Sequence, residues 1–146
     1  MKPEDARDLA LPRPTARAIT VWWVTVTVYA GAIFGASSTP HPLGVHTLPP
    51  FVDKVVHALV YGGLSFTVWM ALRSSAPSAS TRRLSLFAIV LTALYGLTDE
   101  VHQSFVPGRS MEMLDLAADA GGAGLVQGGM SYGRRSRGPN PGNPTP

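Results

Sequence analysis

The sequence predicts an all-α membrane protein, a bundle of four transmembrane helices with both termini cytoplasmic. Of its 146 residues, 45% are hydrophobic and only 14% are charged, whereas a typical soluble domain is roughly 25% charged. Apolar runs long enough to cross a bilayer alternate with polar segments. The basic residues cluster at the ends of these runs, so the net charge of +3 indicates membrane topology rather than nucleic-acid binding. The absence of cysteine excludes disulfides and thiolate chemistry.

Three segments organise the chain. Residues 1–17 are polar and proline-containing, and they are interpreted as a flexible cytoplasmic leader. Residues 18–130 contain the four predicted spans. Residues 131–146, which end in "GPNPGNPTP", have the composition of a disordered cytoplasmic tail.

The first span is predicted from Ala18 to about Ser37, where twenty residues carry no charge. A cleaved signal peptide with "FGASS" as its cleavage site is the alternative, but the apolar run is longer than the apolar core of such peptides. The loop "TPHPLGVHTLPP" has four prolines and cannot be regular helix. The second span is predicted from about Phe51 to Leu72.

The third span is predicted from Leu84 to about Thr98, after a basic loop, and the fourth from Met111 to about Met130. The fourth is the least apolar because it contains three acidic residues. Small residues recur along it at helical spacing and predict a face packed against other helices: Ala117, Gly121, Gly124 and Gly128. The spacings Gly31/Gly35 and Gly124/Gly128 permit a dimer and would serve equally for packing within one bundle.

The distribution of basic residues sets the predicted orientation. With four crossings and a cytoplasmic N-terminus, ten Lys and Arg residues lie on inner segments and two, Lys54 and Arg109, lie outside. Three crossings would place the "RRSR" cluster outside, against the positive-inside rule. We therefore expect a multi-pass protein of the bacterial cytoplasmic membrane whose partner is the lipid bilayer.

Ionisable residues gather at the predicted outer ends of three spans. Asp53, His57 and Tyr61 share one stripe of the second span, at i, i+4 and i+8. The third span ends in Asp99, His102 and Gln103 on one face, with Glu100 on another, and the fourth carries Glu112, Asp115 and Asp119. Because lipid cannot solvate such groups, we expect the stripes to converge on one polar pocket.

The sequence "PGR" after the third span predicts a turn. Pro107 and Gly108 favour a reversal that folds Arg109 back toward the pocket. A guanidinium is suited to forked hydrogen bonding with a carboxylate or a phosphate.

Two blocks of this sequence resemble a known family. "DKVVHALVYGGLSF" at 53–66 and "ALYGLTDEVHQSFVPGRSMEMLDLAADAGGAGLVQG" at 93–128 are similar to the VanZ-like membrane proteins of bacteria, with D-K-x-x-H-x-x-x-Y, Y-G-x-x-D-E-x-H-Q-x-F-x-P-G-R and D-x-x-x-D-x-x-G in that order. The resemblance implies a small multi-span envelope protein, since the namesake is associated with low-level teicoplanin resistance. The resemblance therefore implies a resistance phenotype, but it does not define a chemical reaction.

Three interpretations of the polar pocket stay open. The charges could form a purely structural ion-pair network. They could bind an anionic lipid-linked phosphate or peptidoglycan precursor through Arg109 and Lys54. They could support a membrane-embedded hydrolase or transferase, of which a divalent metal held by His and carboxylates is a variant. The sequence leaves the cofactor unknown, and it assigns no residue to a metal.

The candidate residues divide by role. The candidate catalytic residues are His57, Asp99, Glu100 and His102. The candidate ligand-binding residues are Asp53, Lys54, Tyr61, Gln103, Arg109, Asp115 and Asp119. For Tyr61 the alternative is an interhelical hydrogen bond without contact to a ligand.

Overall fold

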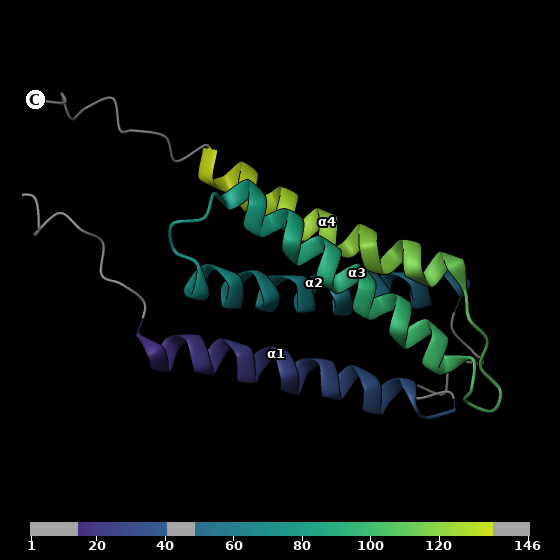
Figure 1. Ribbon diagram of the computed structural model, residues 1–146. Coiled ribbons are helices and arrows are strands. Elements are labelled where there is room, and N and C mark those ends of the chain that lie inside the picture. Colours follow the sequence, from purple (N-terminus) through teal and green to yellow (C-terminus); the bar gives the residue numbers. More distant parts are fainter. Residues whose placement is uncertain (1–14, 41–48, 136–146) are drawn as a thin grey trace, which may run out of the picture.

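The computed structural model describes residues 15–40 and 49–135, which form four long helices: α1 (Ala16–Ser37), α2 (Pro50–Ser75), α3 (Thr81–Gln103) and α4 (Met113–Arg135). The helices alternate in direction, so that both ends of the described chain and the α2–α3 connection lie at one end of the bundle (Figure 1). No strand occurs among the described residues, and the predicted all-α fold is confirmed. Residues 1–14 of the predicted leader and 136–146 of the predicted tail lie outside the described residues.

Local sequence explains where the helices begin. Thr15 caps α1, because its Oγ1 accepts a hydrogen bond from the backbone N–H of Ala18 at 3.3 Å. Pro50 is the first residue of α2, a position where a missing N–H costs no helical hydrogen bond. Ser80 caps α3 by accepting from the N–H of Arg83 at 3.4 Å. The helix α4 continues to Arg135, five residues beyond the predicted boundary at 130.

Three of the helices are long and apolar enough to cross a membrane, namely α1, α2 from Phe51, and α3. The helix α4 is as long as α3 but less apolar, and it runs along α2 and α3 (Figure 1). Large apolar side chains such as Val28, Leu59, Leu94 and Leu125 are exposed on the outside of the bundle. An apolar exterior of this extent is what a bilayer covers.

The core of the bundle lies along α2. Tyr61, Leu64, Val68 and Trp69 are each at least 95% buried, and they pack with Ile33 of α1 and with Leu84 and Ala88 of α3. Tyrosine hydroxyls tie the helices together: Tyr29 donates to the carbonyl of Val60 at 3.0 Å, and Tyr95 donates to that of Ala30 at 2.6 Å. Such bonds hold helices in lipid, where apolar burial drives little association.

The predicted small-residue face of α4 is wrong. A Cβ added at Gly121, Gly124 or Gly128 would meet nothing within 4 Å, so these glycines make no close contact with another helix. Gly122 makes the close approach instead, because a Cβ there would overlap the backbone of Ala58 on α2. The glycine that allows α2 and α4 to touch therefore lies one position from the predicted stripe.

Candidate functional site

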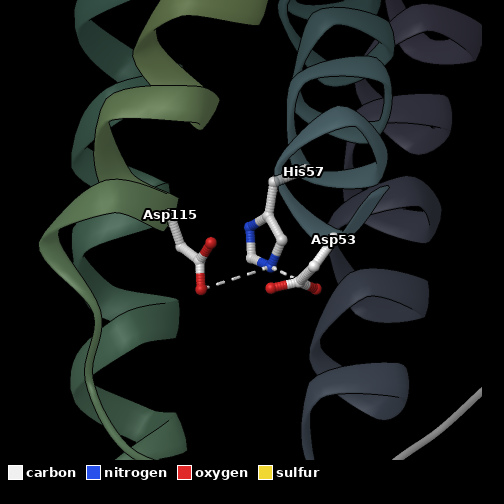
Figure 2. A group of neighbouring side chains, drawn as sticks. All are labelled: Asp53, His57 and Asp115. Atoms are coloured by element: carbon white, nitrogen blue, oxygen red, sulfur yellow. Dashed lines mark ion pairs between the residues drawn. The ribbon is translucent and has the colours of Figure 1, made fainter. Parts of the chain in front are cut away.

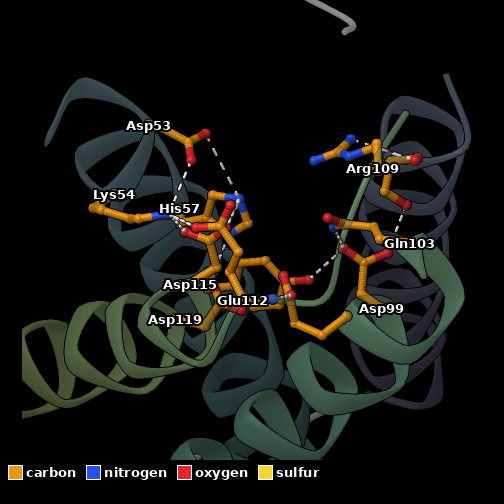
Figure 3. Close-up of polar contacts among 12 residues, drawn as sticks. Asp53, Lys54, His57, Asp99, Gln103, Arg109, Glu112, Asp115 and Asp119 are labelled. Carbon is orange, nitrogen blue, oxygen red and sulfur yellow. Dashed lines mark hydrogen bonds and ion pairs between the residues drawn. The ribbon is translucent and has the colours of Figure 1, made fainter. Parts of the chain in front are cut away.

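The predicted polar residues converge at one end of the bundle, where α1 and α3 end and α2 and α4 begin (Figure 3). They form two groups. The acidic group consists of Asp53, Lys54, His57, Glu100, Glu112, Asp115 and Asp119. The Asp99 group consists of Ser37, Tyr61, Asp99 and Gln103.

Two predicted boundaries shift at this end. The helix α3 runs through Gln103, so its charged residues belong to the helix rather than follow it. Glu112 precedes α4, and its carbonyl oxygen accepts from the N–H groups of Asp115 and Leu116 at the start of that helix. It therefore does not share the helical stripe that the sequence spacing predicted for it.

Lys54 is the cation of the acidic group, and three carboxylates surround it. Its Nζ lies 2.7 Å from Glu112 Oε2 and 3.1 Å from Asp53 Oδ2, and it also pairs with Asp115 Oδ1. Asp115 is buried, whereas Asp53 and Glu112 are more than a third exposed. The ammonium therefore offsets charge on α2, on α4 and on the loop between α3 and α4, and it has little capacity left for an added anion.

His57 lies between carboxylates on both sides of its ring. Its Nδ1 is 2.9 Å from Asp119 Oδ1. Its Nε2 faces Asp53 Oδ1 at 4.0 Å and Asp115 Oδ2 at 3.9 Å (Figure 2). The hydrogen bond between Nδ1 and Asp119 holds the ring plane, which is how an acid orients a histidine base or a histidine metal ligand.

Glu100, which the sequence placed on a different helix face from Asp99, is buried in the acidic group. Its Oε2 accepts the backbone N–H of Glu112 at 2.8 Å, while its Oε1 has no hydrogen-bond partner among the described residues. Asp119 Oδ2 is also buried without a partner. Gly96 makes room for Asp119, since a Cβ at that position would lie 2.8 Å from this oxygen.

Both carboxylate oxygens of Asp99 are hydrogen-bonded. Asp99 Oδ1 accepts from the hydroxyl of Ser37 at 2.6 Å, and Oδ2 accepts from Tyr61 at 3.0 Å and from Gln103 Nε2 at 2.9 Å. Each of these residues is at least 95% buried. Tyr61 thus makes the interhelical hydrogen bond that the sequence offered as the alternative to ligand contact.

His102 lies apart from both groups. Its ring stacks on Phe34 of α1 with centroids 4.3 Å apart, and its Nε2 is 3.0 Å from Ser38 Oγ. No carboxylate pairs with it among the described residues. Of the two predicted catalytic histidines, only His57 therefore has an acidic partner.

The predicted Pro-Gly-Arg turn is confirmed. The N–H of Arg109 donates to the carbonyl of Val106 at 3.1 Å, and Gly108 has φ 79°, a conformation that favours glycine. Arg109 is half-buried and donates from Nη1 to the carbonyl of Ser37 at 3.4 Å. It forms no ion pair within the described segments, so most of its five donors are unused.

A cavity of about 670 Å³ lies toward the other end of the bundle, between α3 and α4. Arg82, Ser85, Gln127 and Ser131 are among its lining residues, and none of the predicted site residues lines it. The polar cluster is therefore separate from this cavity.

Sequence reasoning missed the contribution of α1. Ser37 and Ser38 each bind a motif residue, Asp99 and His102 respectively. The only signal was two adjacent serines at the end of an apolar run, which also fits a loop or a cleavage site.

Comparison with known proteins adds one match. A family model described as VanZ/LLP1 matches residues 11–130, which include every residue of both groups. No curated protein matches. No solved structure matches.

Proposed function

Because the chain belongs to the VanZ/LLP1 family of membrane proteins, we propose that its polar cluster faces outward and binds an anionic, lipid-linked intermediate of the bacterial cell envelope. The single observation that carries this proposal is the state of Arg109. It is half-buried beside Ser37 of the Asp99 group and has no carboxylate partner in the described chain. A guanidinium in that state is suited to forked hydrogen bonds with a phosphate.

The contrast with Lys54 makes Arg109 the main anion-binding residue of the proposal. Lys54 already pairs with three carboxylates, so an added phosphate would have to displace one of them. Arg109 would only lengthen or give up one hydrogen bond, to the Ser37 carbonyl. The role proposed for Lys54 is to hold Asp115 and Glu112 in place beside His57.

The orientation of the protein is part of the proposal. Both termini are cytoplasmic, and the cluster lies at the periplasmic or outer face of the cytoplasmic membrane, as the positive-inside rule favours. Labelling tests this directly, because the chain has no cysteine of its own. A membrane-impermeant maleimide should label Ser110→Cys in intact cells and should label Ser78→Cys only after lysis, and the reverse pattern would contradict the orientation.

Lipid-phosphate binding is tested on the full-length protein in detergent. The probes are undecaprenyl phosphate and its uncharged counterpart undecaprenol, with binding measured by microscale thermophoresis. We expect the phosphate to bind at least tenfold more tightly, and Arg109→Gln to remove that preference. Arg82→Gln is the matched control, since it removes the same charge from the α2–α3 end of the bundle. Equal binding of the two probes, or an unchanged preference in Arg109→Gln, would overturn the proposal.

A second candidate function is hydrolysis or transfer at the lipid phosphate, and the His57–Asp119 pair favours it. A histidine held at 2.9 Å from a buried carboxylate has the arrangement of an oriented general base. Undecaprenyl pyrophosphate incubated with the protein should then release inorganic phosphate, and His57→Gln should abolish release while the lipid still binds. Absence of release in the wild type would leave binding as the function.

Glycopeptide susceptibility is the cellular consequence proposed for this site. Masking or relocating a cell-wall precursor would alter susceptibility without any chemical change to the antibiotic. A strain that expresses the wild type should differ in teicoplanin susceptibility from one that expresses Arg109→Gln at the same membrane level. If both strains respond alike, the cluster has no part in such an effect.

A further inference from the structure

Counted formally over the described residues, the acidic group carries more negative charge than it neutralises. Its five carboxylates are opposed by Lys54 and, when protonated, by His57, which leaves an excess of three negative charges. Three of the carboxylates, those of Glu100, Asp115 and Asp119, belong to residues at least 95% buried. Charge buried without compensation is costly, and proteins keep it for a pairing partner or a metal.

Two buried carboxylate oxygens of the acidic group lack both a hydrogen-bond partner and an ion-pair partner among the described residues. These atoms are Glu100 Oε1 and Asp119 Oδ2. The residues are 1% and 0% exposed, so bulk water does not solvate these atoms. Both belong to side chains that converge on His57, from α3 and α4 respectively.

From this geometry we propose that His57, Glu100 and Asp119 bind one divalent transition-metal ion. Each offers a ligand atom, and the three ligand atoms lie within 4.8 Å of one another. Three ligands at about 2.0–2.2 Å from a shared ion are about 3–3.8 Å apart, so the side chains would have to move together by up to about 1 Å to complete the site. One imidazole and two carboxylates form a mixed nitrogen and oxygen set suited to Mn²⁺ or Zn²⁺.

The surroundings of the three ligands support this assignment. An ion bound by His57 Nδ1 would take the place of the proton between His57 and Asp119, and Nε2 would keep its proton and face Asp53 and Asp115. The backbone N–H of Glu112 holds Glu100 through its other carboxylate oxygen. Lys54 pairs with carboxylates outside the three ligands and has no contact with Glu100 or Asp119 in the described segments, so the ion and the ammonium do not compete for the same oxygens.

The metal site is independent of the proposed lipid. An ion at His57 would add positive charge to the acidic half of the cluster, where Lys54 is already paired. The metal proposal is tested with the metal ion alone. The lipid proposal is tested with the Arg109→Gln variant, and Arg109 is not one of the three proposed metal ligands. Failure of one proposal is therefore distinguishable from failure of the other.

The test measures Mn²⁺ binding to the full-length protein purified in detergent and treated with EDTA. Free Mn²⁺ is counted by electron paramagnetic resonance, and the melting temperature is recorded with and without the ion. We expect one Mn²⁺ per chain and a rise in melting temperature. Glu100→Gln and Asp119→Asn should weaken binding at least tenfold. Glu112→Gln, the matched control, removes a charge from the same group without touching the three ligands and should bind like the wild type.

Three results would overturn the proposal. The first is a wild type that binds no more Mn²⁺ than empty micelles do. The second is a loss in Glu112→Gln equal to that in Glu100→Gln, which would mean diffuse attraction of cations to negative charge. The third is a loss in Asp53→Asn with full binding in Glu100→Gln, which would place the ion on the Nε2 side of His57. Helical circular dichroism identifies a misfolded variant, and Glu100→Asp, which keeps the charge but withdraws the carboxylate, then serves in its place.

Discussion

Replacing Gly122 by alanine tests the contact that brings α2 and α4 together. Gly122 lies three residues after Asp119, and the backbone it touches belongs to Ala58, the residue after His57. Separation of the helices at this point would therefore also separate the His57–Asp119 pair. Gly124→Ala is a matched control, because it makes the same chemical change two residues later, where a Cβ meets nothing within 4 Å.

The expected magnitude follows from two opposing effects. Alanine in a helix interior is more favourable than glycine by about 1 kcal/mol, and both substitutions gain this. At Gly122 the new methyl group falls well inside the 3.0 Å below which Cβ atoms essentially never approach. Overpacking costs about 1–3 kcal/mol, and the upper value applies because the obstacle is backbone and cannot rotate away. We expect a loss of about 2 kcal/mol in Gly122→Ala and a gain of about 1 kcal/mol in Gly124→Ala.

The free energy of unfolding is measured by titrating each purified variant from mild detergent into sodium dodecyl sulfate while helical circular dichroism is recorded. The two variants should differ by about 3 kcal/mol, with the wild type between them. Equal stability of Gly122→Ala and Gly124→Ala would refute the close approach of α2 and α4. If Gly122→Ala is destabilised as expected but still binds Mn²⁺ normally, the contact at Gly122 does not position the His57–Asp119 pair.

The remaining predictions concern the charged network and the turn. Asp99→Asn should cost about 1–3 kcal/mol in the same unfolding titration, because an amide cannot accept all three donors that now bind the carboxylate. Lys54→Gln should cost about 2 kcal/mol, since it removes the lysine counterion of buried Asp115. Addition of Asp115→Asn should restore part of the loss, and a double variant less stable than Lys54→Gln would contradict this. Gly108→Ala should cost about 1 kcal/mol, because φ 79° is strained for alanine, and should weaken undecaprenyl phosphate binding by displacing Arg109; unchanged affinity would separate the turn from the ligand.

The sequence predicted the helices well because each has a strong local cause. Uncharged runs of about twenty residues and the prolines between them set α1 and α2, and Pro107-Gly108 set the turn. The end of α3 was missed by five residues, since charged side chains at a helix end look like the start of a loop. Whether such a segment stays helical depends on partners such as Ser37, which belong to another helix.

The sequence could not predict which polar side chains contact one another, for a similar reason. Spacing on a helix fixes which residues share a face, but it does not fix the rotation of that helix against its neighbours. The stripe of Gly121, Gly124 and Gly128 has the period of a packed face, yet the phase that tertiary contacts select is that of Gly122. Likewise the sequence placed Lys54 and Arg109 in equivalent roles. Only the contacts distinguish Lys54, which pairs with three carboxylates, from Arg109, which pairs with none in the described chain.

Tyr61 has a consequence for how protons move in this protein. Its ring is nearly parallel to that of His57, with an interplanar angle of 3° and centroids 6.1 Å apart, and its hydroxyl proton points at Asp99. A ring face offers no donor or acceptor comparable with a hydroxyl or a carboxylate, so the described side chains form no proton wire through Tyr61 from His57 to Asp99. Protonation of His57 and of Asp99 is therefore not linked by hydrogen bonds through Tyr61, and the solvent-exposed carboxylate nearest His57 Nε2 is that of Asp53.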